Sequence, residues 1–243
     1  MILSSSTKKP SIDASAYVAP TATISGDVTI GAGCAILHGA IVVAEGAPIT
    51  LGTECVIMEN AVVKASGGSI VRFPTTIGAR CIVGPHAYIV GASIGDGCFI
   101  ASGARVFNGA QIGERSSVAL GAIVHISTKV EPGTRVPMQH IAYGNPGKIV
   151  APEHAPEVHE RLDFFESVFN LEASDDVRAK AAASYARFLR KTHAQDAPVG
   201  DGTHRTKKNA DAKPPDIPVT DDVVDAMMLE LQRMESLRNK KKR

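Results

Sequence analysis

The chain has 243 residues, with 26 lysines and arginines against 25 aspartates and glutamates, so its formal net charge at neutral pH is only +1. A nearly neutral chain exerts no broad electrostatic attraction on nucleic acid, and we expect no nucleic-acid partner. No stretch of the sequence is apolar enough to predict a membrane span, so membrane insertion is not expected either. The length suffices for one sizeable core and a tail.

Residues 1–12 combine an Ile-Leu pair, a run of serines and two lysines. They contain no apolar stretch of signal-peptide length, so secretion is not expected. We predict a flexible N-terminus here. The alternative is an organelle transit peptide, because the segment is basic and rich in serine.

Residues 13–150 carry an aliphatic residue at every sixth position, apart from two interruptions and one five-residue step from Ile89 to Ile94. The repeat comprises Val18, Ile24, Ile30, Ile36, Val42, Leu51, Ile57, Val63, Ile77, Val83, Ile89, Ile94, Ile100, Val106, Ile112, Val118, Val124, Val130 and Val136. Neither an α-helix nor an ordinary strand repeats at six, whereas short strands joined by tight turns do. The pattern therefore predicts an all-β solenoid, a parallel β-helix with a column of isoleucine and valine as its core.

The four cysteines, Cys34, Cys55, Cys81 and Cys98, each lie four positions after a repeat aliphatic. Other hexads carry small residues there, so we interpret the cysteines as small buried core residues. The sequence has no CxxC pair and no cluster with ligand spacing, so neither a zinc site nor a disulfide framework is expected. Free thiols suit a reducing compartment.

Two interruptions break the repeat, at residues 44–48 and 65–76. Insertions in a solenoid emerge as surface loops, and such loops often form contact surfaces. The second interruption is therefore a candidate interface with a partner or another subunit, with an ordinary solvated loop as the alternative.

The repeat ends at the turn sequence Tyr-Gly-Asn-Pro-Gly-Lys of residues 143–148. After it, the spacing of Leu162 and Phe165 follows helical timing, and a second helix is predicted to begin at an N-cap at Ser174. We therefore predict helices packing on the β-helix over residues 151–191.

Residues 192–219 are polar and rich in proline, aspartate, lysine and glycine, which predicts a flexible linker. Residues 220–243 show an amphipathic helical pattern, with Met227, Leu231 and Met234 on one face and a basic end. We expect a tethered helix whose apolar face either docks on a partner or folds back onto the solenoid.

Over residues 13–150 these features resemble the left-handed parallel β-helix proteins with hexapeptide repeats. The left hand of the coil is implied by this resemblance alone. The superfamily includes hexapeptide acyltransferases, γ-class carbonic anhydrases and the small pointed-end subunits of dynactin.

The γ-carbonic anhydrase pattern is similar in its scaffold, including a closing turn at residues 144–148 close to the family's GNPAK. On this resemblance the family's three zinc histidines correspond to Lys64, Pro85 and Val90. None of these residues replaces a neutral imidazole, so we expect no metal and no cofactor. Without zinc there is no bound hydroxide, and the sequence argues against an enzyme.

An acyltransferase would need a histidine base beside an acceptor and a cleft for an acyl thioester. His38 and His86 are the only histidines that we consider as bases, and no acceptor site is recognisable beside either. Hexapeptide-repeat acyl transfer is kept as an alternative function.

Short matches resemble the dynactin branch: Ala-Glu-Gly-Ala-Pro-Ile at residues 44–49, Met-Glu-Asn at 58–60 and Leu-Asp-Phe-Phe at 162–165. This resemblance implies a non-catalytic scaffold or adaptor subunit in dynein-based microtubule transport, cytoplasmic and cytoskeletal. Its partners would be a related β-helix subunit, the actin-related filament end and motor adaptors, in a homo- or hetero-oligomer. The alternative is a γ-carbonic-anhydrase-like subunit of a mitochondrial respiratory complex.

Residues on the interruptions and on the apolar helix faces are the predicted contact points for such partners. They are Glu45, Pro48, Glu59, Phe73, Leu162, Phe165, Met227, Leu231 and Met234.

Overall fold

The computed structural model describes residues 1–5, 8–67, 71–161, 164–172 and 174–199. Part of the prediction lies outside these ranges: Leu162, most of the predicted linker, and the predicted terminal helix with Met227, Leu231 and Met234. The contact roles predicted for these four residues stay predictions.

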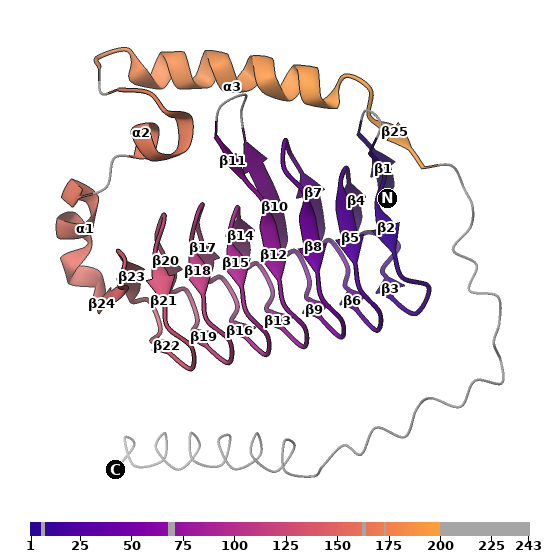
Figure 1. The fold of residues 1–243 in the computed structure, drawn as a ribbon, viewed down its shortest axis with the longest axis horizontal. Coiled ribbons are helices and arrows are strands. Elements are labelled where there is room, and N and C mark those ends of the chain that lie inside the picture. The colour runs from indigo at the N-terminus through magenta and orange to yellow at the C-terminus, as the bar shows by residue number, and fades with distance from the viewer. Residues whose placement is uncertain (6–7, 68–70, 162–163, 173, 200–243) are drawn as a thin grey trace, which may run out of the picture. The chain divides into compact units, whose positions relative to one another are not determined.

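Three parallel β-sheets wrap into a solenoid of about eight turns (Figure 1). The first sheet contains β1 (Ile2–Ser4), β4 (Thr23–Ser25), β7 (Ile41–Ala44), β10 (Val62–Gly67), β14 (Tyr88–Val90), β17 (Arg105–Val106), β20 (Ile123–Val124) and β23 (Ile141–Tyr143). The second contains β2 (Ser11–Ile12), β5 (Val28–Ile30), β8 (Ile49–Leu51), β12 (Thr75–Ile77), β15 (Ser93–Ile94), β18 (Gln111–Ile112) and β21 (Lys129–Val130). The third contains β3 (Tyr17–Val18), β6 (Ala35–Ile36), β9 (Val56–Ile57), β13 (Ile82–Val83), β16 (Phe99–Ile100), β19 (Ser117–Val118) and β22 (Arg135–Val136).

The repeat aliphatics stack in register at the centre of the solenoid. Val63 of β10 pairs with Val42 of β7 on one side and with Ile89 of β14 on the other, and all three side chains are fully buried. Because strands in one sheet come from consecutive turns, every third hexad returns to the same sheet. The predicted hexad-repeat solenoid, followed by helices, is confirmed.

The cysteines form a ladder in the core and are free and buried, as predicted. Each thiol donates to the carbonyl of a glycine in the next turn: Cys55 Sγ lies 2.9 Å from the Gly78 oxygen, and Cys81 Sγ lies 3.1 Å from the Gly95 oxygen. One turn later Ser116 makes the same contact, with its Oγ 3.1 Å from the Glu131 carbonyl. The position therefore suits a small side chain that can donate a weak hydrogen bond.

Residues 1–12 were predicted to be flexible, but the described ones, residues 1–5 and 8–12, belong to the first turn of the solenoid. β1 pairs in parallel with β4, and β2 pairs in parallel with β5. The sequence carried a signal for this, since Ile12 lies six residues before Val18 and extends the repeat by one hexad. The solenoid therefore begins before residue 13.

Both ends of the first sheet are covered by antiparallel strands from later in the chain. β24 (Lys148–Val150) pairs with β23 at the last turn, and β25 (Ala197–Pro198), which lies within the predicted linker, pairs with β1 at the first. An uncovered edge strand offers unpaired backbone groups to other chains. The chain thus protects this sheet at both ends itself.

The helices begin after β24 with η1 (Pro152–His154) and α1 (Ala155–Arg161). Val158 of α1 packs on Ile141 and Tyr143 of the last turn. α2 (Phe164–Phe169) and α3 (Val177–His193) follow, and α3 runs along the flank of the solenoid back to the first turn (Figure 1). The structure begins α3 after Asp176, two residues beyond the predicted cap at Ser174. No helix of the described part is long and apolar enough to cross a membrane.

The described residues of the interruption at 65–76 form an antiparallel strand pair that continues β10. β11 (Arg72–Phe73) pairs antiparallel with the end of β10, through Ser66 opposite Phe73 and Gly67 opposite Arg72, and the pair is called the β10–β11 hairpin here. The hairpin rises toward α3 and brings Phe73 to the flank that α3 covers (Figure 1).

Candidate functional site

Two of the three positions that the resemblance to γ-carbonic anhydrases assigns to zinc histidines lie side by side on the flank of the first sheet. Lys64 of β10 pairs in register with Val90 of β14. Pro85 lies in the turn between β13 and β14 and is partly buried. Valine and proline side chains have no atom that coordinates zinc. In the described ranges no three histidine, cysteine, aspartate or glutamate side chains gather in a way that could hold a metal.

Lys64 forms an ion pair with a buried carboxylate. Its Nζ lies 2.9 Å from Glu45 Oε1, and the side chains of Lys64 and Glu45 are 23% and 9% exposed. The other carboxylate oxygen, Oε2, accepts a hydrogen bond of 2.9 Å from the hydroxyl of Tyr185 on α3. His193 Nε2, near the end of α3, lies 3.9 Å from Glu45 Oε1. A single buried carboxylate thus joins the sheet to both halves of α3.

Glu45 was predicted to contact a partner, and the structure corrects this, because α3 of the same chain covers it. Its position results from the first interruption, where Gly46 adopts a left-handed conformation with φ of 76°. The interruption moves Glu45 off the repeat and turns its carboxylate to the flank. Burial, followed by the charge of this carboxylate, raises the pKa of the Tyr185 hydroxyl, which therefore donates to Glu45.

The remaining described contact candidates differ in exposure. Pro48 is exposed and Glu59 half-buried, so both stay open to a partner as predicted contacts. Phe165 is half-buried and stacks on Phe169, with ring centroids 6.2 Å apart. Phe73 is half-buried, and its Cβ lies so close to Gly91 that a Cβ at that glycine would be 2.4 Å away. Phe73 and Phe165 therefore serve the packing of this chain first.

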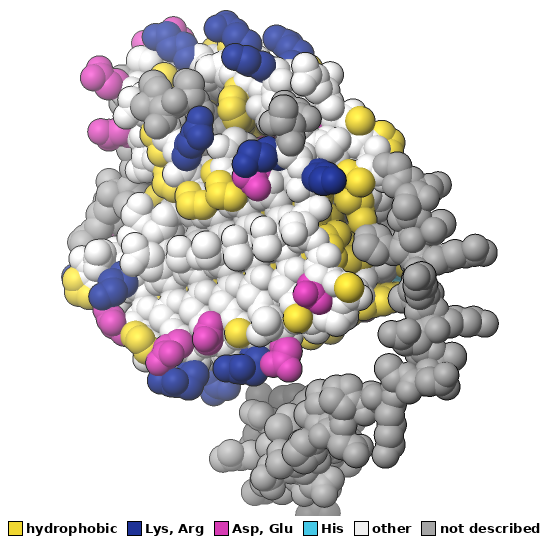
Figure 2. Space-filling view, turned by 45° about the vertical axis from the view of Figure 1, so that its right-hand side comes forward, with side chains coloured by type: hydrophobic (Ala, Val, Ile, Leu, Met, Phe, Trp, Pro, Cys, Tyr) yellow, Lys and Arg dark blue, Asp and Glu magenta, His cyan; other side chains and the backbone are white. Residues whose placement is uncertain are grey.

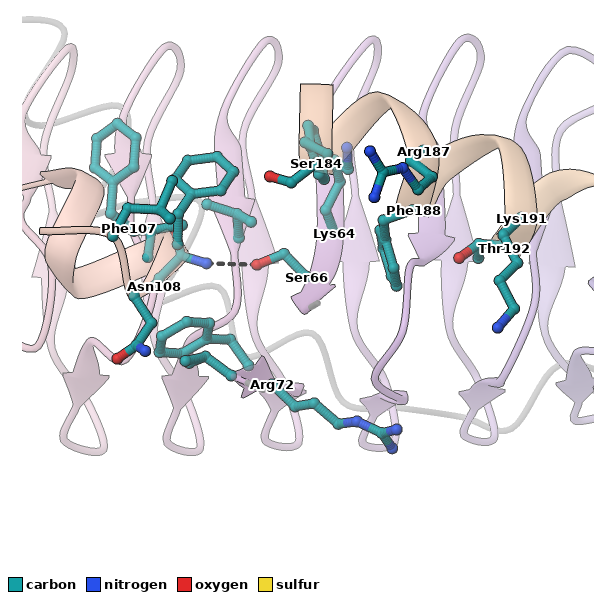
Figure 3. Close-up of a pocket in the computed structure, with 18 of the residues that line it drawn as sticks. Lys64, Ser66, Arg72, Phe107, Asn108, Ser184, Arg187, Phe188, Lys191 and Thr192 are labelled. Atoms are coloured by element: carbon teal, nitrogen blue, oxygen red, sulfur yellow. Dashed lines mark hydrogen bonds between the residues drawn. The ribbon is translucent and has the colours of Figure 1, made fainter. Parts of the chain in front are cut away.

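A cavity of about 970 Å³ opens between the β10–β11 hairpin, the flank of β14 and β17, and the helices α2 and α3 (Figure 3). Lys64 and Val90 lie on its wall, so the region that corresponds to the zinc site borders the cavity. Asn108 on its floor donates from Nδ2 to Ser66 Oγ at 2.5 Å and ties the hairpin to the turn after β17. Sequence reasoning missed this cavity, because its helical wall is over a hundred residues away from Lys64 in the chain.

The histidines considered as acyltransferase bases do not meet an acceptor site. His38 is exposed, with Nδ1 2.9 Å from Thr21 Oγ1, and His86 is exposed in a left-handed turn with φ of 57°. His125 is half-buried against Phe107, and desolvation, followed by the charge of His159, lowers its pKa. Neither His38 nor His86 lines the cavity.

Fold and flank together define the class: the chain is a parallel β-solenoid with hexapeptide repeats, and its α-helices close one side of the solenoid. No protein-family model matches the sequence. Among curated proteins it is similar to γ-carbonic anhydrase 1, mitochondrial, of Arabidopsis thaliana, with 27% identity over 192 residues, covering 77% of this chain and 68% of that protein. The likeness to γ-carbonic anhydrase 2, mitochondrial, of the same plant is also 27%, over 193 residues.

Solved structures give matches in the same class. They include a UDP-N-acetylglucosamine acyltransferase of Francisella novicida, with 14% identity, 75% and 85% of the two chains covered and a TM-score of 0.46. Another is a GDP-perosamine N-acetyltransferase of Caulobacter crescentus, with 28% identity, 58% and 56% covered and a TM-score of 0.38. The comparisons favour the γ-carbonic-anhydrase-like alternative and give no support to the dynactin and cytoskeletal prediction.

Proposed function

We propose that this protein is a zinc-free γ-carbonic-anhydrase-like subunit that acts as a structural, non-catalytic part of a mitochondrial oligomer. The observation that carries the proposal is the Lys64–Glu45 ion pair, which lies at a position that the resemblance to γ-carbonic anhydrases assigns to a zinc histidine. The scaffold role predicted from the sequence is kept, and the dynactin assignment gives way to the branch that the curated relatives support.

The ion pair and its neighbours disfavour a metal on physical grounds. An ammonium group offers Zn²⁺ no lone pair and repels its charge, and Glu45 holds this ammonium at 2.9 Å. Zinc-dependent hydration of carbon dioxide requires a metal ion that lowers the pKa of its bound water to about 7. With Val90 and Pro85 at the other two positions, these three residues supply no ligand set for that step.

Assembly is supported by the outer surface of the third sheet. Tyr17, Ile82 and Phe99 are 52%, 42% and 46% exposed, and they lie in one register column with Ala35 and Val56. Such an apolar stripe across five turns is costly to leave in water. Hexapeptide-repeat β-helix proteins commonly form oligomers. We assign this stripe to contact with another β-helix, either a second copy or a related subunit.

Location in the mitochondrion is supported by the two plant relatives, both of which are named mitochondrial. A respiratory complex is the assembly proposed for it there. Tagging the chain, isolating mitochondria and resolving native complexes by gel and mass spectrometry would test this. Co-migration with respiratory subunits is expected, and exclusion from mitochondria would contradict the location.

Catalysis is tested by stopped-flow measurement of carbon dioxide hydration with zinc supplied during purification. We expect the rate to equal that of buffer. A rate above buffer that an active-site inhibitor abolishes would contradict the proposal.

The stripe is tested by native mass spectrometry of the Phe99→Ser variant, with Ile41→Ser on the first sheet as the matched control. We expect Phe99→Ser to shift the protein toward monomer, and Ile41→Ser to keep the oligomer. A wild-type chain that is monomeric, without a related subunit in the pull-down, would contradict the assembly role.

A further inference from the structure

The cavity beside α3 has the size and lining of a binding site. We propose that it binds an amphipathic anion, a molecule with an apolar body and one carboxylate or phosphate head. Its volume of about 970 Å³ is at the upper end of the range for small-molecule sites and far exceeds the need of bicarbonate. This ligand assignment is independent of the assembly that the chain joins.

The charge of the lining favours an anion. Four basic residues line the cavity, Lys64, Arg72, Arg187 and Lys191, and no aspartate or glutamate does. Lys64 is neutralised by Glu45, whereas no carboxylate among the described residues forms an ion pair with Arg187 or Lys191. Basic side chains without partners at an open cavity attract anions electrostatically.

Arg187 and Lys191 are positioned to act together. They are four residues apart on α3, which places them on the same face of the helix about one turn from each other. The hydroxyls of Ser184 and Thr192 lie on the same wall (Figure 3). Ser184 Oγ already donates to the Ala181 carbonyl at 3.0 Å, so a carboxylate or phosphate head at this rim would meet two cations and the hydroxyl of Thr192.

The interior of the cavity is aromatic and aliphatic, which suits an apolar body. Tyr88 and Phe107 lie with ring centroids 6.3 Å apart on the sheet, and Phe188 stacks against Tyr185 at 6.3 Å on the helix side. Phe73 lies across Gly91 and completes this lining. Figure 2 shows hydrophobic and basic side chains gathered on the same upper part of the surface.

Few side chains in the interior of the cavity could form hydrogen bonds to a polar ligand. Asn108, 4% exposed, already donates to Ser66. A nucleobase needs several hydrogen bonds to its edges for specific recognition, whereas an alkyl chain or an aryl ring needs only the apolar contacts present here. The polar groups at the rim and the apolar interior together favour an amphipathic anion.

Isothermal titration calorimetry of the full-length protein tests this, with dodecanoate and dodecyl phosphate as the probes. Dodecanol lacks the charge, and acetate and inorganic phosphate lack the apolar body. We expect saturable one-site binding of dodecanoate or dodecyl phosphate, or of both, and at least tenfold weaker binding of all three controls. Comparing the two probes distinguishes a carboxylate from a phosphate head.

The double variant Arg187→Gln/Lys191→Gln should weaken the binding of the anionic probe at least tenfold. Each substitution removes a positive charge and, with it, a charge-assisted contact to the head group of the probe. Arg190→Gln is the matched control, since Arg190 is exposed on the same helix and does not line the cavity. Equal affinity in the double variant and the control would overturn the proposal. So would an equally tight dodecanol complex, or the absence of saturable binding in the wild type.

A second measurement needs no variant. A dodecanoate analogue with a diazirine in its chain, photolysed with the wild-type protein, should label peptides that contain β11, β17 or α3. Labels confined to the exposed stripe of the third sheet would overturn the cavity as the site. Carbon dioxide hydration plays no part in either readout, so failure here is distinguishable from failure of the proposed function.

Discussion

The core of the solenoid and the flank under α3 are built from different kinds of contact. In the solenoid each aliphatic side chain stacks on an equivalent one in the next turn, as Val63 does on Val42 and Ile89, so one local pattern repeats. On the flank, Glu45 and Tyr185 meet across 140 residues of sequence, and nothing repeats. The comparison shows that a β-helix keeps its scaffold while the chemistry on its surface changes, because the core pattern and the outward residues vary independently.

The largest expected effect is on the core. Ile57→Ala should lower the free energy of unfolding by about 2–5 kcal/mol, because Ile57 is fully buried and its stacked neighbours cannot close the cavity. Ile41→Ala is the matched control, since Ile41 is 38% exposed on β7 of the first sheet, and should cost less than about 1 kcal/mol. Urea unfolding followed by circular dichroism measures both. An equal loss of unfolding free energy in the two variants would contradict the burial of Ile57 in a stacked core.

The next effect concerns the carboxylate under α3. Glu45→Gln should destabilise the protein by roughly 3 kcal/mol, because it leaves the partly buried Lys64 without its counter-charge. Glu54→Gln is the control, since Glu54 is 56% exposed and lies 4.0 Å from Arg80, and should change little. Hydrogen exchange of α3 should accelerate only in Glu45→Gln. Unchanged exchange would show that α3 is held without the ion pair.

The smallest effect is on the pH dependence of stability. Desolvation, followed by the charge of His159, lowers the pKa of His125 below its ordinary value of 6.5 in the folded state. The unfolded chain then takes up the proton first, so stability should fall as the pH drops below about 6.5. His125→Gln should flatten the stability profile between pH 7 and pH 5, while exposed His38→Gln should not. Identical profiles of the wild type and His125→Gln would contradict the burial of this ring.

The hexads predict most of the solenoid because each one obeys a local steric rule. Ile12 lies six residues before Val18, so even the unexpected first turn had a signal in the sequence. The site was predictable only in part. On the resemblance to γ-carbonic anhydrases, the identities of Lys64, Pro85 and Val90 predict that zinc ligands are missing, but nothing local in the sequence indicates which contacts Lys64 makes instead.

The contacts around Lys64 and Glu45 depend on how α3 packs on the solenoid. The spacing of Tyr185 and Phe188 predicts an apolar helix face, but it does not specify the surface that this face covers. From the sequence alone Glu45 is expected to be an exposed loop residue, whereas in the structure α3 covers it. Long-range contacts of this kind have no periodic signature, and the cavity formed by α3 has none either.

The most direct test of the account is the zinc content of the purified protein, measured by plasma mass spectrometry after expression and purification with excess zinc. The account predicts far less than one zinc per chain, because Lys64 is paired with Glu45 and neither Val90 nor Pro85 can coordinate a metal. One zinc per chain that survives dialysis against a weak chelator would contradict it.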